Sequence, residues 1–339
     1  MNILIMTPGA VGFKSPTVYV AEELQRRGHR VGLVVDPDGH KIVYEGDWDV
    51  VFGDMERSCV PAFLTASTLG VKCYLHGEWI PKFRVECTNE WGPGCISSDE
   101  EIAYWKAFYR PIAGILHKAD VSSWASPIFR KYAEQFSGRE YGDFCFDRFT
   151  RLPSNVPSEP VPMEQAEYAV AICSRLAPIK RVPALVEAVG RMKTHKPRVY
   201  VVGDGPDRLE AIQKAREYGL DIEFCGATGE EDKWGFLAKS RVMLSAWTGI
   251  PPGEALMLGR PTIAYDHPHI RELYGDTLLY VKNNSIDAMA QRLDEVLEFS
   301  GYLNDFAQSG RKKLLDGETG LKTFDRGVDE IENVLLSLA

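Results

Sequence analysis

The sequence predicts an α/β protein of two domains, each a parallel sheet covered by helices. Strand patterns alternate with helical patterns along the chain. The first strand, residues 1–7 (MNILIMT), is the continuous apolar run typical of a parallel strand covered on both faces. The length of 339 residues exceeds one ordinary core and suits two domains of about 150 residues each. Residues 152–162 contain four prolines, which disfavour regular structure and indicate a linker.

The N-terminal half begins with a strand, loop, helix and second strand. The loop contains Gly9 and Gly12, and it is followed by a helical pattern over residues 17–29 and a strand over residues 30–35. It lacks the G-x-G-x-x-G spacing of a dinucleotide site, so we do not assign NAD binding to it. Its glycines would let the backbone approach a ligand, and a simple tight turn is the alternative.

Two strand ends in the C-terminal half carry cationic or glycine-rich loops. The apolar strand that begins at Ala169 runs into a loop with Arg175 and Lys180, and the next strand runs into a turn with Gly203 and Gly205. Open α/β sheets bind their ligands at the carboxyl ends of such strands, so these loops are candidate ligand contacts. Solvated surface cations are the alternative for the first loop.

A third loop combines a Gly/Pro-rich turn, a carboxylate and a short helix. Over residues 249–265 the sequence predicts a turn, a two-turn helix closed by Gly259 and Pro261, and a strand. Glu254 falls in the first helical turn, where the helix dipole favours negative charge and free amides can hold an anion. Its carboxylate can also accept two hydrogen bonds from a vicinal diol. A structural helix cap is the alternative.

These loops together resemble the retaining nucleotide-sugar glycosyltransferases of the large family four, the glycosyl transferases group 1, over nearly the whole chain. The resemblance implies the GT-B fold, in which two Rossmann-like domains face each other across a cleft and a C-terminal helix returns to the N-terminal domain. It implies transfer of a sugar from a nucleotide-diphosphate sugar to an acceptor hydroxyl with retention of the anomeric configuration. The matching segments are Ser174-Arg175-Leu176, Lys180-Arg181, Gly203-Asp204-Gly205-Pro206, Phe224-Cys225-Gly226 and the loop from Ala246 to Ala255.

The resemblance also implies roles for individual residues. Arg175 and Lys180 would hold the diphosphate of the donor, and Glu254 would bind its ribose hydroxyls. His76, in a stretch similar to the family's Val-x-His-Gly signature, would face the donor sugar as a third catalytic residue, with a structural histidine as the alternative. The N-terminal glycine loop would lie near the acceptor. The other donor-binding positions are Gly203, Gly205, Gly226, Thr228, Gly249, Ile250, Pro251 and Gly253.

The chemistry of the loops agrees with these roles. A departing nucleoside diphosphate develops negative charge on its leaving oxygen, and the Arg and Lys side chains would stabilise that charge where it forms. We therefore expect activity without a metal ion or another cofactor. A UDP- or GDP-sugar is the expected donor. The acceptor would be a glycan, a glycolipid or a small molecule.

One position departs from the family pattern. Ala246 stands where the family has the first glutamate of the loop, which generally contacts the donor sugar or lies beside the phosphates. The identity of the sugar is therefore open. So are two alternatives, a nucleotide-sugar-binding protein without transferase activity and a GT-B sugar-nucleotide epimerase. Ser174 and Arg181 replace glycines of the family, and we expect both replacements to be tolerated in loops.

We expect an acceptor domain over residues 1–158 and a donor domain over residues 159–322. A terminal helix over residues 323–339 would pack back on the first domain. The formal net charge of −9 argues against nucleic acid as a partner. The seven cysteines lack C-x-x-C spacing, so neither a zinc site nor a disulfide framework is indicated, although Cys87 and Cys95 are a candidate pair.

No run approaches the roughly 20 apolar residues of a membrane span, and no signal peptide is recognised, so a cytoplasmic location is expected. Aromatic and cationic residues follow His76 in the sequence. They are suited to stack on sugar rings or to rest on lipid headgroups at the inner face of a membrane. Ordinary loop and helix packing is the alternative.

Overall fold

The computed structural model describes residues 1–9, 16–77, 99–128, short pieces between 130 and 167, and residues 169–339 except Thr248. The chain divides into two compact units. One comprises Met1–Ser154 together with Phe324–Ala339, and the other comprises Asn155–Thr323. The terminal segment therefore belongs to the N-terminal unit, as the fold-class prediction requires.

The N-terminal unit contains a six-stranded parallel sheet in the order β2-β1-β3-β4-β5-β6. The chain starts in β1, adds β2 on one side, and then crosses to β3 on the other, so the strand order reverses between β1 and β3. Five of the six residues of β1 are buried, as its continuous apolar pattern predicts. The strands are β1 (Asn2–Thr7), β2 (Arg30–Val35), β3 (Val50–Asp54), β4 (Lys72–Gly77), β5 (Val121–Trp124) and β6 (Cys145–Asp147).

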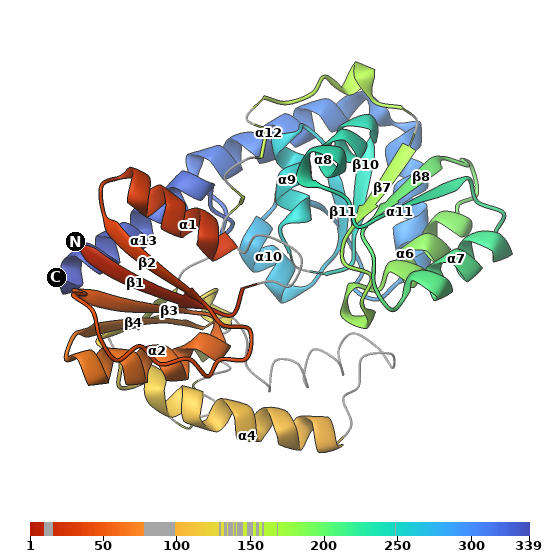
Figure 1. Cartoon of the computed structure of the whole chain (residues 1–339). Coiled ribbons are helices and arrows are strands. Elements are labelled where there is room, and N and C mark those ends of the chain that lie inside the picture. The colour runs from red at the N-terminus through yellow and green to blue at the C-terminus, as the bar shows by residue number, and fades with distance from the viewer. Residues whose placement is uncertain are drawn as a thin grey trace. The chain divides into compact units, whose positions relative to one another are not determined.

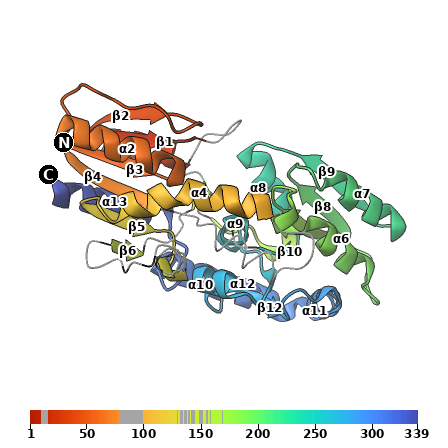
Figure 2. The ribbon, with the colours of Figure 1, turned by 90° about the horizontal axis from the view of Figure 1, so that it is seen from below.

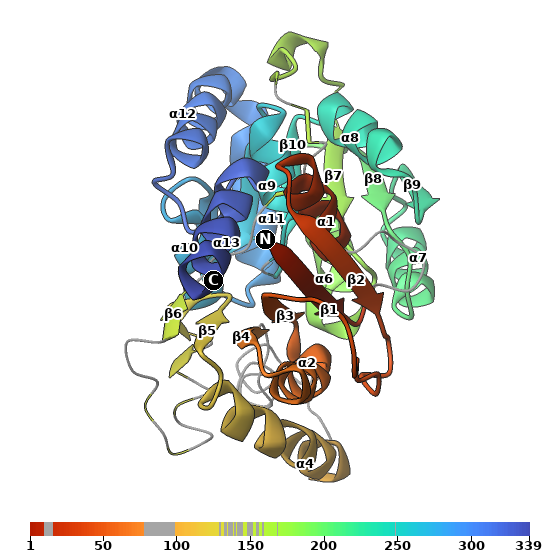
Figure 3. The ribbon, with the colours of Figure 1, turned by 60° about the vertical axis from the view of Figure 1, so that its left-hand side comes forward.

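Helices cover both faces of this sheet (Figure 1). The helices α2 (Glu56–Leu69) and α4 (Asp99–Leu116) lie on one face. The other face is covered by α1 (Pro16–Arg26) and α13 (Phe324–Leu338), which lie beside each other (Figure 3). Apolar residues of α13 at helical spacing, among them Val328, enter the same core as α1 and strands β1, β3 and β4.

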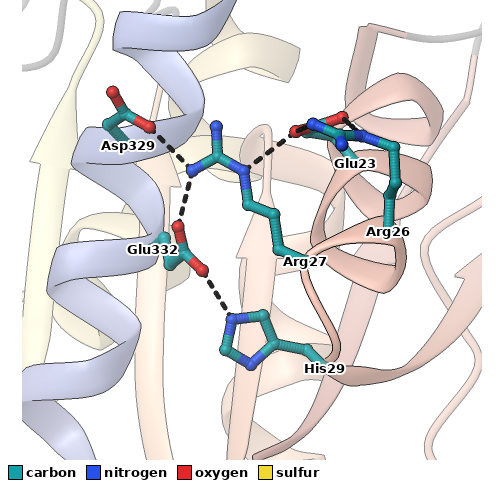
Figure 4. A network of polar contacts seen from close by, with 6 residues as sticks. All are labelled: Glu23, Arg26, Arg27, His29, Asp329 and Glu332. Carbon is teal, nitrogen blue, oxygen red and sulfur yellow. Dashed lines mark hydrogen bonds and ion pairs between the residues drawn. The ribbon is translucent and has the colours of Figure 1, made fainter.

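A polar network also holds α13 against the N-terminal unit (Figure 4). Arg27 Nη1 lies 2.7 Å from Asp329 Oδ1 and 2.6 Å from Glu332 Oε2, and His29 Nε2 lies 2.7 Å from Glu332 Oε1. Burial raises the pKa of Glu332, but the hydrogen bonds from His29 and Arg27 outweigh it and leave that pKa below its usual value. We call these four residues the terminal clasp.

The C-terminal unit contains a second six-stranded parallel sheet, in the order β12-β11-β10-β7-β8-β9. Its strand order reverses between β7 and β10, the point at which doubly wound sheets bind ligands. The strands are β7 (Ala169–Cys173), β8 (Arg198–Val202), β9 (Ile222–Gly226), β10 (Val242–Ser245), β11 (Thr262–Tyr265) and β12 (Leu279–Val281).

The helices of this unit again form two layers. On one face, α6 packs against both α7 and α11, and the pair α6 and α7 is seen beside β8 in Figure 2. On the other, α9 packs against α8 and α12. The helices are α6 (Val182–Gly190), α7 (Arg208–Glu217), α8 (Glu230–Lys239), α9 (Pro251–Met257), α10 (Pro268–Tyr274), α11 (Ile286–Glu298) and α12 (Leu303–Asp316).

A buried arginine fixes the proline-rich segment to this unit. Arg260 is 1% exposed, and its guanidinium donates to the carbonyl oxygens of Ala238 at 2.6 and 3.0 Å, Val161 at 3.0 Å and Pro162 at 3.2 Å. The amide of Val161 donates in turn to Leu258. The end of the segment at Val161 is therefore held by a side chain as well as by backbone.

Candidate functional site

The loops after β7 and β10 form a pocket at the point where the strand order of the C-terminal sheet reverses. The loop after β7 contributes Ser174 and Lys180, and the end of β10 contributes Ser245 and Ala246. The start of α9 closes the pocket. Two of the three loops that the sequence singles out are thus brought together at the expected edge of the sheet.

Lys180 and Arg175 follow β7 on a loop that ends in a single turn of 3-10 helix. Arg175 is exposed, whereas Lys180 is partly buried and its Nζ would lie 3.4 Å from a methyl group placed on Gly249. Burial, and after it the charge of Arg175, lowers the pKa of Lys180 to about 7. The lysine is therefore held in a place where a nearby anion would stabilise its charged form.

Gly203 and Gly205 support that loop from the neighbouring strand end. Both have positive φ, 130° and 153°, and a Cβ at either position would collide with a carbonyl oxygen, of Ser174 or Leu176 respectively. The Leu176 amide donates to the Asp204 carbonyl at 2.9 Å. The glycines are therefore required for contact between two backbone segments. Their contact with a ligand stays a prediction.

Arg181, for which the sequence resemblance expects a glycine, adopts a left-handed conformation with φ 49° and ψ 37°. This conformation costs an arginine about 1 kcal/mol relative to glycine. Its guanidinium donates to Asn284 and lies 5.6 Å from the centre of the Tyr265 ring. These contacts explain how the loop tolerates a residue with a side chain.

Glu254 lies in the first turn of α9, as predicted, and is 1% exposed. The N-cap residue of α9 is Ile250, whose side chain makes no capping hydrogen bond. Glu254 Oε1 lies 2.7 Å from Lys233 Nζ, whereas Glu254 Oε2 is buried and makes no hydrogen bond in the structure. Burial raises the pKa of Glu254, and Lys233 partly opposes that rise.

A tyrosine that the sequence analysis did not identify orders the loop before Glu254. The Tyr274 hydroxyl accepts from the Gly253 amide at 3.2 Å and donates to the Gly249 carbonyl. Ile250 and Pro251 lie within the segment that this hydroxyl bridges. The residue is 0% exposed and comes from α10, so only the tertiary fold relates it to the site.

The end of β9 places two further candidates. Gly226 has a left-handed φ of 73°. Thr228 Oγ1 is buried and makes no hydrogen bond. Both precede α8, the helix that carries Lys233. The unsatisfied hydroxyl is consistent with a polar ligand near this turn.

The region of the missing glutamate is apolar and aromatic. Ala246 is 2% exposed, and the Trp247 ring lies 5.7 Å from the His267 ring and 6.3 Å from the His269 ring. The two histidines follow β11 and were missed in the sequence, although Asp266-His267-Pro268-His269 directly follows an apolar strand. Burial, and then His267, lowers the pKa of His269 to about 3, so this ring is neutral at physiological pH.

In the N-terminal unit, His76 is 2% exposed and lies at the end of β4. Its Nδ1 is 2.9 Å from Ser123 Oγ, which in turn lies 2.7 Å from the Tyr74 hydroxyl. Asp54 on β3 is its register partner and accepts a hydrogen bond from Thr17. His76 thus belongs to a buried polar row across β3, β4 and β5.

Gly9 follows β1 and has a φ of 68°, and its amide nitrogen lies 3.4 Å from Thr7 Oγ1. Gly12 and residues 78–98, which include Cys87 and Cys95, lie outside the described residues. Within the described part of the chain, no three His, Cys, Asp or Glu side chains are grouped to hold a metal ion. In that same part, none of the helices combines the length and apolarity needed to cross a membrane.

Part of the chain matches a known protein family. Residues 159–313 match the family of glycosyl transferases group 1. The matched segment lies within the C-terminal unit and contains all three loops of the candidate site. No curated protein sequence matches the chain.

Solved structures match both units. HepE from Anabaena in complex with UDP superposes with a TM-score of 0.75 at 13% identity, over 100% of each chain. Sucrose-phosphate synthase from Thermosynechococcus elongatus gives 0.75 at 14% identity, over 99% of this chain and 98% of the other. A glycosyltransferase from Rickettsia africae gives 0.73 at 14% identity, with the same coverage. The likeness confirms the predicted fold class, a GT-B fold of two Rossmann-like domains.

Proposed function

We propose that the protein is a retaining glycosyltransferase, which transfers a sugar from a nucleoside-diphosphate sugar to an acceptor hydroxyl without a metal ion. The observation that carries the proposal is the pocket at the strand reversal, where Lys180 from one loop meets the start of α9 from another. The pocket lies in the part of the chain that matches the glycosyl transferases group 1. HepE, which shares the fold, has been solved with UDP and with UDP-glucose.

In the proposed reaction, Arg175 and Lys180 stabilise the departing diphosphate. Negative charge grows on the leaving oxygen as the glycosidic bond breaks, and fixed cations in a partly desolvated pocket are most effective at that moment. The acceptor hydroxyl enters on the face that the diphosphate leaves, and the phosphate oxygen takes its proton. His76 faces the donor sugar in this scheme.

Glu254 binds the ribose of the donor. A buried carboxylate oxygen without a hydrogen bond is costly, and its burial is explained if a ligand supplies the missing donor. A ribose diol has two hydroxyl donors to offer. UDP- and GDP-sugars both remain candidate donors, and glycans, glycolipids and small molecules remain candidate acceptors at the inner face of a membrane or in the cytoplasm.

A second candidate function is nucleotide-sugar binding without transfer. It is favoured by Ala246, which is buried beside Trp247 and offers no carboxylate to the donor sugar. A third, epimerisation of the donor, would need no acceptor.

The test is turnover with a panel of UDP- and GDP-sugars, with and without mixed acceptors. We expect release of nucleoside diphosphate that depends on the acceptor, and a product with the anomeric configuration of the donor. Binding of donor without release would favour the binding protein. Isomerised donor in the absence of acceptor would favour the epimerase, and an inverted product would contradict retention.

A further inference from the structure

Lys233 lies on α8 and reaches the candidate nucleotide site from outside its three loops. Its Nζ is 2.7 Å from Glu254 Oε1, and its side chain is 19% exposed against 1% for Glu254. The same Nζ also lies over the Trp234 ring, 5.5 Å from its centre. The pair is therefore a mostly buried ion pair, in which both partners have a fixed place.

We propose that Lys233 is a positioning residue of the nucleotide site, which occupies one oxygen of the Glu254 carboxylate and leaves the other for the ribose diol. The inference rests on the proposed function, in which Glu254 binds ribose. Lys233 itself would not contact the reacting atoms.

Two buried polar atoms support this division of the carboxylate. Glu254 Oε2 and Trp234 Nε1 are both buried, and neither makes a hydrogen bond of ordinary geometry. The indole of Trp234 still lies close enough to this carboxyl group to lower its pKa through a weak N–H···O contact. A hydroxyl group can donate to a carboxylate and accept from an indole at once, so one ribose hydroxyl would satisfy both atoms.

The charged surroundings of Glu254 show why a cation is needed. Glu230 on α8, Cys173 on β7 and Tyr274 on α10 interact electrostatically with the carboxylate, and none of them carries positive charge. Burial, and then the charge of Glu254, raises the pKa of Cys173 to about 12. Lys233 is the nearby cation that opposes protonation of Glu254. Without it, burial would favour the neutral carboxyl, which is a weaker acceptor.

The experiment is calorimetric titration of the full chain with UDP and GDP, at pH values from 8 to 6. Lys233→Met should weaken binding of the preferred nucleotide at least about tenfold at pH 7, because a charge-assisted contact is lost. The ratio of wild-type to variant affinity should increase as the pH falls, because the variant carboxyl gains its proton at higher pH. Comparison at each pH removes the titration of the nucleotide itself.

Three variants make the result specific. Lys239→Met is the matched control, because Lys239 is an exposed lysine of the same helix that lies over Phe236 at 5.8 Å. It should bind as wild type. Lys233→Arg should keep most of the affinity for the nucleotide. If Lys233→Met does not fold, the affinity of Lys233→Arg still tests the role of the positive charge. In the Glu254→Gln background, Lys233→Met should cause little further loss.

The outcomes distinguish failure of the inference about Lys233 from failure of the proposed function. Tighter binding by Lys233→Met would overturn the inference and make the lysine a competitor for the ribose position. Unchanged affinity and pH dependence would also overturn it, and would leave an ordinary structural ion pair. If Glu254→Gln binds as wild type, the ribose role of Glu254 fails and the inference about Lys233 fails with it, whereas a wild type that binds neither nucleotide would contradict the proposed function itself.

Discussion

Each unit has polar residues at the carboxyl ends of the strands of its parallel sheet, but these residues are arranged differently in the two units. In the N-terminal unit, Asp54, His76 and Ser123 lie in one row on adjacent strands, and their side chains are hydrogen bonded within the unit. In the C-terminal unit, Glu254 has one oxygen paired and one without a partner, and Lys180 has a lowered pKa. The three side chains of the N-terminal unit therefore have partners within that unit, whereas Glu254 and Lys180 would be stabilised by a ligand that carries negative charge and hydroxyl groups.

The largest effect should come from the cations of the C-terminal edge. Arg175→Ala and Lys180→Ala should each slow transfer about a hundredfold or more, because each removes ~3 kcal/mol of stabilisation of the leaving diphosphate. Steady-state rates with the donor identified in the panel measure this. Lys239→Ala on α8 should keep the wild-type rate. Wild-type rates in both cation variants would mean that this edge does not hold the diphosphate.

Removal of the carboxylate should have the next largest effect. Glu254→Gln should weaken binding of the bare nucleoside diphosphate by roughly 1 to 3 kcal/mol, because an amide presents a single acceptor oxygen to the diol. Calorimetry measures the change directly. An unchanged dissociation constant would show that the unpaired oxygen is not the ribose contact. It would also remove the contrast between the two edges.

The sequence predicts some residues of the candidate site but not others. Arg175, Lys180 and Glu254 follow strand patterns directly, so the rule that ligands bind at the carboxyl ends of parallel strands finds them. Lys233 lies 21 residues before Glu254, and Tyr274 forms hydrogen bonds across 21 and 25 residues. Lys233 and Tyr274 each lie on a neighbouring helix. Helical periodicity predicts which face of such a helix is buried, but it does not predict which residue of another element that face will contact.

The N-terminal edge shows a related limit. The sequence identifies His76 as a strand end, but its neighbours depend on strand order and register. Asp54 and Ser123 become its neighbours only because β4 pairs with β3 on one side and β5 on the other. The two-domain α/β fold itself follows from local patterns that repeat along the chain, which is why the sequence predicts its class.

A pH effect should distinguish Lys180 from Arg175. Because burial lowers the pKa of Lys180 to about 7, the free enzyme loses that positive charge as the pH rises through this value. We therefore expect kcat/KM to fall between pH 7 and 9, since this ratio reports groups of the free enzyme. In Lys180→Arg the charge persists at all these pH values, and the alkaline fall should disappear. An identical fall in that variant would assign the titration to another group.

A smaller effect is expected at the terminal clasp of the N-terminal unit. Glu332→Gln should destabilise the docking of α13 by about 1 kcal/mol at pH 7, since two partly buried contacts lose their charge. The folded-state pKa of Glu332 is lowered, so its contribution is present above the unfolded value and is lost as the pH falls through the folded one. Hydrogen exchange of the α13 amides reports the docking locally.

The control for the clasp is Asp329→Asn. Asp329 binds the same Arg27 nitrogen but its side chain is 57% exposed against 19% for Glu332, so its loss should accelerate exchange less. Nucleotide binding should be unaffected in both variants, because their contacts lie in the N-terminal unit. Equal exchange in wild type and Glu332→Gln would show that apolar packing alone holds the helix.

The smallest expected effect is that of metal removal. Excess EDTA should leave the transfer rate unchanged within error, because Arg175 and Lys180 supply the positive charge that a divalent cation provides in other nucleotide sites. The decisive comparison is between wild type and Lys180→Ala, each assayed with EDTA and with added magnesium or manganese. If magnesium restores activity to Lys180→Ala but does not change the wild type, a cation at this edge can be replaced by a metal ion. A wild-type rate that EDTA abolishes and magnesium or manganese restores would contradict the metal-independent mechanism.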